Sequence, residues 1–251
     1  MTTQETSRPA ATGFALQPDG RPRWTPQAVL FDCDGTLMDT EPCWSAALAE
    51  LFARNGLLWS PEEKPHYIGR TTHAMATRMA DTLGDPGLSG ALEKELLDLC
   101  AEAVADSAAP LPGARELLAT IGPLVPVAVV SNSPRRILDI ALERGGLRDL
   151  VAFTVAAEDP PRPKPAPDPY LMACDQFAAD PARVLVVEDS LTGLTAARAA
   201  GTVTLGIPTL TDSTFPADLI LDSLAAPALA RWATAWRANA RPDPTPQGDN
   251  A

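Results

Sequence analysis

The sequence has few cysteines and few histidines, and this scarcity excludes two classes of site. Its 251 residues include four cysteines and two histidines. No two cysteines form a Cys-x-x-Cys pair, and neither histidine lies at ligand spacing from a cysteine, which argues against a zinc site or a disulfide framework. We therefore expect four free thiols in a reducing compartment and predict a cytoplasmic protein.

A long apolar segment is also missing. No stretch is long enough to cross a bilayer, and residues 1–26, rich in Thr, Pro, Gln and Arg, lack the apolar core of a signal peptide. The formal net charge of −12 repels nucleic-acid backbones and anionic lipid, so we expect neither nucleic acid nor membrane as a partner. The same charge repels phosphorylated substrates, so a phosphate site would need a local concentration of positive charge.

Short apolar runs alternate with helical patterns along the middle of the chain. Runs this short, bounded by turn residues, are typical of strands buried on both faces. Helix start and stop signals such as Ser133-Pro134, Asp168-Pro169 and Gly201 separate them. Strands alternating with helices predict a doubly wound α/β fold with a parallel sheet and right-handed crossovers. The predicted strands are 28–31, 127–130, 184–187 and 203–205.

The stretch from Cys43 to Ala109 has helix-like spacing and no strand signal. Trp44, Ala47 and Leu51 fall on one helix face, and Leu92, Leu96 and Cys100 repeat this spacing later. We interpret the stretch as a small helical domain inserted after the first strand. The predicted division is a core of residues 25–41 and 110–240, a helical domain of residues 42–109, and disordered Pro-rich tails at 1–24 and 241–251.

Polar residues follow three of the predicted strands directly. In an open parallel sheet, ligands bind beyond the carboxyl ends of the strands, so these residues should converge on one rim. The rim residues are Asp32, Asp34, Ser131, Asn132, Glu188 and Asp189.

Several carboxylates at one rim repel each other unless a cation lies between them, and hard oxygen ligands suit Mg²⁺. A carboxylate can attack phosphorus directly, and a second acid two residues along could protonate the leaving alcohol. Asp32 and Asp34 have the spacing for these roles, because alternate residues of an extended chain share a face.

Donors to phosphoryl oxygens are also present. Ser131 and Asn132 offer hydroxyl, amide and backbone N–H groups beside a predicted helix N-terminus, which favours anions. Lys164 adds a full positive charge in a loop that its neighbours Pro163 and Pro165 stiffen.

Taken in order, these motifs resemble the four motifs of the haloacid dehalogenase superfamily over about residues 27–221. The inserted helical domain resembles the cap of the subgroup that contains β-phosphoglucomutase and many sugar-phosphate phosphatases. The resemblance implies a Rossmann-like core with a helical cap. The motifs read Asp32-Cys33-Asp34-Gly35-Thr36-Leu37-Met38-Asp39, Ser131-Asn132, Lys164-Pro165-Ala166-Pro167-Asp168-Pro169-Tyr170, and Glu188-Asp189-Ser190 followed by Gly193 and Ala196-Ala197.

The resemblance also implies a role for each acid. Asp32 would be the nucleophile and a Mg²⁺ ligand. Asp34 would be the general acid/base and would lend its backbone carbonyl to the metal; its presence argues against a true dehalogenase. Asp189 would bind Mg²⁺, with Glu188 doing so directly or through water.

Further residues would contact the substrate. By the same resemblance, Ser131 and Lys164 would hold the phosphoryl group, with Asn132 beside them. Thr36 is the usual phosphatase-like residue after the motif glycine. Arg70 lies in a Gly-containing turn of the kind that caps place over the active site, so it could contact the substrate.

The sequence thus predicts a Mg²⁺-dependent phosphatase that hydrolyses a small phosphorylated metabolite, such as a sugar phosphate, through an aspartyl-phosphate on Asp32. The cap would close over the site to exclude water. We expect a monomer or weak homodimer. Two alternatives stay open. A sugar-phosphate mutase is disfavoured because β-phosphoglucomutases carry His where this chain has Trp44, and a non-catalytic phosphoester-binding module is disfavoured by the intact set of acids.

Overall fold

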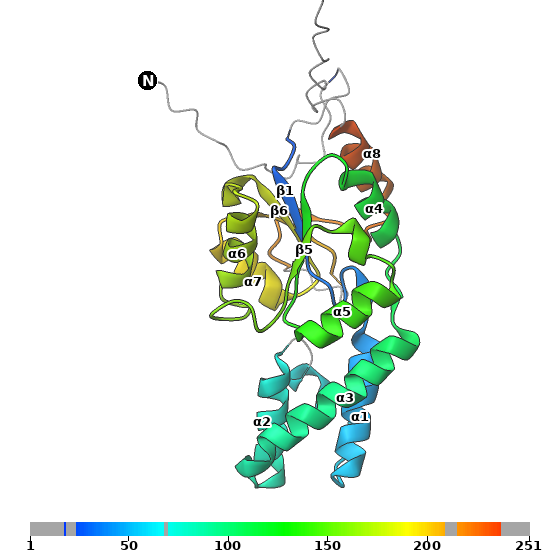
Figure 1. Ribbon diagram of the computed structural model, residues 1–251, viewed down its shortest axis with the longest axis vertical. Coiled ribbons are helices and arrows are strands. Elements are labelled where there is room, and N and C mark those ends of the chain that lie inside the picture. Colours follow the sequence, from blue (N-terminus) through cyan, green and yellow to red (C-terminus); the bar gives the residue numbers. More distant parts are fainter. Residues whose placement is uncertain (1–17, 19–23, 68–69, 209–214, 237–251) are drawn as a thin grey trace, which may run out of the picture.

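A six-stranded parallel sheet forms the centre of the molecule (Figure 1). We describe it from a computed structural model, which covers residue 18 and residues 24–67, 70–208 and 215–236. The spatial order β5-β4-β1-β6-β7-β8 starts from a central first strand and extends to both sides, which confirms the predicted doubly wound fold. The strands are β1 (Ala28–Phe31), β4 (Val127–Val130), β5 (Phe153–Val155), β6 (Val184–Glu188), β7 (Val203–Gly206) and β8 (Leu219–Ile220).

The four predicted strands are all present, and two of them run one residue further than predicted, to Glu188 and Gly206. Strands β5 and β8 were not predicted. They lie at the two edges of the sheet, with three and two residues, and such short segments carry little periodicity. The predicted tails at 1–24 and 241–251 lie outside the described residues except for Pro18 and Trp24.

Alternate side chains of the strands point to two hydrophobic layers. Val29 and Phe31 face the layer under α4 (Ala114–Ile121), α5 (Arg135–Arg144) and α8 (Pro227–Ala235). Ala28 and Leu30 face the layer under α6 (Asp168–Gln176) and α7 (Leu191–Ala199). Figure 1 shows the two helix groups on opposite sides of the sheet. Because both faces are covered, the central strands β1, β4 and β6 are apolar up to their carboxyl ends, and polar groups gather where these strands end.

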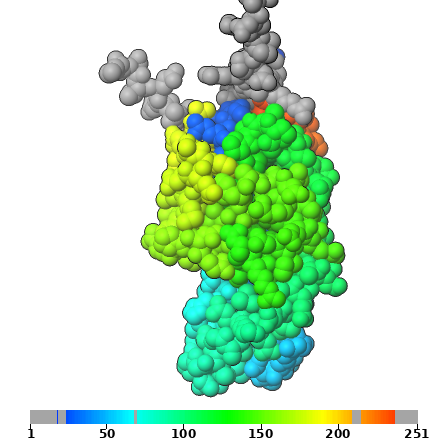
Figure 2. Space-filling view, viewed as in Figure 1, coloured from blue at the N-terminus to red at the C-terminus, as the bar shows by residue number. Residues whose placement is uncertain are grey.

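A second lobe at one end of the molecule contains three helices (Figures 1 and 2). These are α1 (Glu41–Arg54), α2 (Thr72–Leu83) and α3 (Ser89–Ser107), and they form the helical cap expected from the sequence. The chain enters the lobe through β2 (Met38–Asp39) and leaves through β3 (Ala109–Pro110), which pair antiparallel. The two connections to the core therefore lie side by side.

The cap packs on the core through α3 and α5. Asp98 accepts a bond from Arg136 Nη1 at 2.6 Å, and the backbone carbonyl of Asp106 accepts one from Arg144 Nη2 at 2.7 Å. The two partners on each helix are separated by about two turns, so the helices run alongside each other in the same direction. In the described part of the chain, no helix is both long and apolar enough to span a membrane.

Short single-turn 3₁₀ segments complete the connections, and no disulfide links the elements of the described residues. All four cysteines are buried and form no disulfide, as expected. The 3₁₀ segments are Lys64–His66, Pro86–Leu88, Arg148–Leu150 and Pro181–Arg183.

Gly113 lies where the chain re-enters the core, and Gly56 after α1 offers a comparison for the packing there. Gly113 and Gly56 both have left-handed φ, at +86° and +71°. A Cβ at Gly113 would lie 2.3 Å from the backbone N of Ala225, whereas one at Gly56 would meet nothing within 4 Å. We expect Gly56→Ala to cost about 1–2 kcal/mol for its backbone conformation. Gly113→Ala should cost about 1–3 kcal/mol more for the overlap. Urea denaturation measures both; equal losses would contradict the close approach at Gly113.

Candidate active site

The predicted rim residues come together because the strands end in register. Phe31 at the end of β1 lies opposite Val187 of β6 and Val129 of β4. The next residue, Asp32, donates its backbone N–H to the Val187 carbonyl at 2.9 Å. This register places the side chains that follow β1 beside those that end β6 and follow β4.

Three carboxylates form a cluster at this rim. One oxygen each from Asp32, Glu188 and Asp189 lies within 4.8 Å of the others. Asp32 and Glu188 are buried, and Asp189 is half-buried. Gly35 lies against the cluster, because a Cβ there would come within 2.3 Å of Asp189 Oδ2. The Asp34 side chain is not part of the cluster, and its backbone carbonyl remains a predicted ligand.

The cluster has the chemistry of a metal site. Its donors are all hard oxygens, which suit a divalent cation. Burial raises the pKa of the Asp32 carboxyl well above its ordinary value; the Lys164 charge opposes this rise, and Glu188, Asp189 and Asp34 add to it. One ammonium therefore does not balance the negative charge gathered here, and these residues could bind a metal ion.

Lys164 supplies the positive charge at the rim. Its side chain is 3% exposed, and Nζ donates to Asp32 Oδ1 at 2.6 Å, to the Val130 carbonyl at 2.7 Å and to Glu188 Oε1 at 2.7 Å. Burial acts to lower the pKa of Lys164, but the charges of Asp32 and Glu188 outweigh it and the net shift is upward. The ammonium is therefore held in its charged form against the predicted nucleophile.

Asn132 holds the backbone of Lys164. Its Oδ1 accepts from the Lys164 backbone N–H at 3.0 Å, and its Nδ2 donates to the Lys164 carbonyl at 3.0 Å. These two hydrogen bonds fix the loop that carries the lysine. The sequence indicated a phosphate contact for Asn132; its contacts in the structure are with the lysine loop.

Four donors surround the Asp34 carboxylate. Thr40 Oγ1 and Trp44 Nε1 donate to Oδ1 at 2.6 and 3.4 Å, and Ser131 Oγ and Ser133 Oγ donate to Oδ2 at 3.0 and 2.7 Å. Thr40 lies directly before the first cap helix α1 and Trp44 lies within it, and the last two donors belong to the loop after β4. The predicted general acid/base thus lies at the junction of cap and core.

Sequence reasoning missed Thr40 and Ser133 as site residues. Ser133 was expected to cap the following helix, but α5 starts at Arg135 with Pro134 in the N-cap position. The Ser133 hydroxyl is therefore available to Asp34. The spacing Ser131-Asn132-Ser133 after a buried strand could have indicated two hydroxyls on one face.

Thr36 and Arg70 lie in different surroundings, one buried and one exposed. Thr36 is fully buried, and its Oγ1 is 3.5 Å from Asp189 Oδ1, the outer limit of a hydrogen bond. Arg70 is exposed, directly before Thr71, whose side chain caps α2. The phosphate and substrate contacts proposed for these two residues remain predictions.

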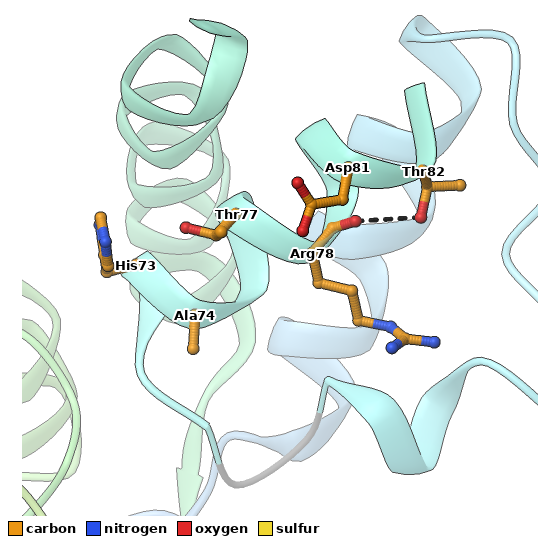
Figure 3. A pocket seen from close by; sticks show the side chains of 6 residues that line it. All are labelled: His73, Ala74, Thr77, Arg78, Asp81 and Thr82. Carbon is orange, nitrogen blue, oxygen red and sulfur yellow. Dashed lines mark hydrogen bonds between the residues drawn. The ribbon is translucent and has the colours of Figure 1, made fainter. Parts of the chain in front are cut away.

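A surface hollow of about 630 Å³ lies along α2 of the cap (Figure 3). A hydrogen bond joins two of its lining residues, from Thr82 Oγ1 to the Arg78 carbonyl at 3.0 Å. The rim residues do not line it among the described residues, so it is distinct from the carboxylate site. The lining residues are His73, Ala74, Thr77, Arg78, Asp81 and Thr82.

Comparisons with known proteins point to one family. The model of the haloacid dehalogenase-like hydrolases matches residues 26–201. The chain is 32% identical over 209 residues to validoxylamine A 7'-phosphate phosphatase from Streptomyces hygroscopicus subsp. limoneus, covering 79% of this chain and 94% of that protein. It is 34% identical over 184 residues to N-acetylmuramic acid 6-phosphate phosphatase from Pseudomonas aeruginosa, covering 72% and 81%. The crystal structure of CbbY from Rhodobacter sphaeroides in complex with phosphate matches with a TM-score of 0.71 and 27% identity, covering 80% and 96%.

Adding Mg²⁺ should stabilise the metal-free protein through the carboxylate cluster. A ligand at about 100 times its Kd that binds only the folded state adds about 2.7 kcal/mol to the free energy of unfolding. We expect Asp189→Asn to lose most of this gain. Asp149→Asn, which removes one exposed negative charge elsewhere, should keep it. Thermal unfolding with MgCl₂ and with chelator measures the effect, and an equal response of both variants would contradict the assignment.

Proposed function

Because this chain belongs to the haloacid dehalogenase-like hydrolase family, we propose that it is a Mg²⁺-dependent phosphatase that hydrolyses a small phosphate monoester through an aspartyl-phosphate on Asp32. The observation that carries the proposal is the contact of Lys164 Nζ with Asp32 Oδ1 at 2.6 Å inside the carboxylate cluster. A buried carboxylate with one oxygen bound to an ammonium keeps a fixed orientation and directs its other oxygen to a substrate.

The first step transfers the phosphoryl group to the protein. The second oxygen of Asp32 forms a bond to phosphorus as the bond from phosphorus to the ester oxygen breaks. Asp34 gives a proton to the departing oxygen, which leaves as an alcohol. Lys164 stabilises the negative charge that gathers between nucleophile and phosphoryl oxygens.

The second step regenerates the enzyme. Asp34, now ionised, takes a proton from a water molecule as that water attacks phosphorus. The bond between phosphorus and Asp32 breaks, inorganic phosphate leaves, and Asp34 is protonated for another cycle. The four hydroxyl and indole donors around Asp34 suit the ionised form that it takes between the first step and the second.

Asp32, Asp189 and the Asp34 backbone carbonyl would hold Mg²⁺, with Glu188 binding directly or through water. When bound, the ion neutralises charge on the transferring phosphoryl group. Ser131 and Lys164 would hold the phosphoryl group, Lys164 through its charge because its three N–H groups bond to the protein. Asn132 would act through the lysine loop, and Thr36 would support the metal side through Asp189.

The substrate class follows from the relatives. Two of them are named for phosphate esters of a muramic acid sugar and of validoxylamine A. We propose a sugar phosphate or similar polar metabolite for this chain. Its non-phosphate part would meet the cap, residues 42–109, while residues 25–41 and 110–240 hold the phosphate; Arg70 at the start of α2 is the proposed cap contact. The paired connections β2 and β3 support this division.

A mutase finds no support in the site. The Trp44 indole donates to Asp34 Oδ1 but has no basic nitrogen that could exchange a proton with it. A binding module without turnover would not need both a nucleophile held by an ammonium and a second acid two residues away.

Asp32→Asn should abolish the release of inorganic phosphate from a panel of sugar and other small phosphate esters. Loss of a catalytic nucleophile costs about 10³-fold or more in kcat. The wild type should release phosphate with Mg²⁺ and stop with chelator. Asp149→Asn serves as the charge-matched control and should retain activity. If Asp32→Asn keeps wild-type turnover, another residue is the nucleophile. If the wild type instead isomerises a sugar monophosphate when a bisphosphorylated sugar is added, the enzyme is a mutase.

The role of Asp34 can be tested with two leaving groups. For an alkyl phosphate, Asp34→Asn should lower kcat/KM by about 10²–10⁴-fold, the usual contribution of a general acid. The loss should be smaller for p-nitrophenyl phosphate, because p-nitrophenolate leaves without a proton. The comparison uses kcat/KM, which reports formation of the aspartyl-phosphate. Equal losses with both esters would rule out proton donation to the leaving group.

A further inference from the structure

Both oxygens of the Glu188 carboxylate are fully engaged by protein donors. Oε1 accepts from Lys164 Nζ at 2.7 Å and from the Tyr170 hydroxyl at 2.7 Å. Oε2 accepts from the Ser190 backbone N–H at 3.2 Å and from Ser190 Oγ at 2.9 Å. An ionised carboxylate has about four lone-pair sites. Direct binding of a cation to Glu188 would therefore require one of these donors to leave.

The first turn of α7 fixes the other side of Glu188. Ser190 caps this helix, and its Oγ accepts from the Gly193 backbone N–H at 3.0 Å while donating to Glu188. A Cβ at Gly193 would lie 1.6 Å from Glu188 Oε1, so the carboxylate packs directly on the bare backbone of the helix. Glu188 has no room to rotate toward α7.

Tyr170 closes the remaining side from α6. It is fully buried, its hydroxyl donates to Glu188, and its ring lies under the ammonium of Lys164, with 4.9 Å between Nζ and the ring centroid. An ammonium over an aromatic face is attracted by the ring. Tyr170 therefore contacts both members of the Lys164–Glu188 ion pair, one through its hydroxyl and one through its ring.

The contacts form a continuous chain from α6 to the nucleophile. The Tyr170 hydroxyl holds Glu188, Glu188 holds Lys164, and Lys164 holds Asp32 Oδ1. An ammonium has three N–H groups, and the third is bound to the Val130 carbonyl. All three N–H groups of Lys164 are thus bonded to the protein. The orientation of the ammonium therefore depends on where Glu188 Oε1 lies.

We propose that Tyr170 is a positioning residue, and that Glu188 serves as the charge partner that orients Lys164 against Asp32 and not as a direct metal ligand. The Tyr170 hydroxyl keeps Glu188 Oε1 at the place where Lys164 needs it. The role of Asp32 as phosphoryl acceptor comes from the proposed function, on which this inference rests.

The two tyrosines of the chain provide a matched test. Tyr170→Phe removes the hydroxyl and keeps the ring under Lys164. Tyr67→Phe removes an equally buried tyrosine hydroxyl in the cap, where the ring packs against Phe52 and Trp59. The measurements are kcat and KM for one ester, the Mg²⁺ dissociation constant of the metal-free protein by calorimetry, and Tm.

We expect Tyr170→Phe to lower kcat by about 10-fold, the lower end of the effect of removing an outer partner of a catalytic site. KM and the Mg²⁺ dissociation constant should stay at their wild-type values, and Tyr67→Phe should leave kcat unchanged. A kcat equal in the two variants would overturn the proposal, because the hydroxyl would then only stabilise the fold. A Mg²⁺ affinity that falls together with kcat would also overturn it, because Glu188 would then act on the metal.

A turnover-independent readout separates this inference from the proposed function. Beryllium trifluoride adds to a carboxylate as a mimic of an acyl phosphate, and fluorine NMR in the presence of Mg²⁺ measures its binding to Asp32. Tyr170→Phe should weaken this binding by about 10-fold relative to wild type and to Tyr67→Phe. Equal binding in all three proteins would overturn the positioning role even in an active enzyme. A wild type that binds the mimic but hydrolyses no ester would overturn the proposed function alone.

Discussion

The buried ammonium of Lys164 is the interaction on which the rest of the rim depends. Asp32 and Glu188 lie in the interior at the ends of adjacent strands, and their negative charges would be costly there without a cation. The ammonium is equally costly alone, since its side chain is almost wholly buried and its three hydrogen bonds go to these two carboxylates and the Val130 carbonyl. Breaking such a pair by removing one partner costs about 3–5 kcal/mol. The groups that would perform the chemistry therefore also stabilise the folded core. In a chain with a net charge of −12, Lys164 brings a positive charge to the rim where a phosphate group would bind.

The strands and the rim residues could be predicted because both depend on short stretches of sequence. An apolar run followed at once by acids gives the position of Asp32 and Glu188, and the parallel topology places such ends together. The contacts of Thr40, Ser133 and Tyr170 could not be predicted in this way. Each joins two elements through the direction of a side chain, and that direction depends on where a helix starts. A shift of the start of α5 by one residue frees the Ser133 hydroxyl for Asp34. The edge strands β5 and β8 could not be predicted, because two or three residues are too few to show a hydrophobic periodicity.

The hydrogen-bond donors of Asp34 connect this proposed catalytic carboxylate to the cap. Two of its donors, Thr40 and Trp44, belong to the segment that enters the cap, and two, Ser131 and Ser133, belong to the core. A displacement of α1 therefore changes the donors around the carboxylate that we propose as general acid/base. The contacts between α3 and α5 add a second connection, through Arg136 and Arg144. In the described part of the chain, the segment that enters the cap bonds to Asp34, whereas the hydrogen bonds of Lys164 go to Asp32, Val130 and Glu188 of the core.

The antiparallel pairing of β2 with β3 has a consequence for how such an enzyme diversifies. The cap begins and ends at neighbouring points, so its removal or exchange would leave a gap that a short turn could close. The six-stranded sheet and the ion pair at its rim are complete without any residue of the three cap helices. Recombination or insertion at this one ribbon can thus exchange the whole cap, while the sheet and the ion pair of Lys164 with Asp32 and Glu188 are inherited intact.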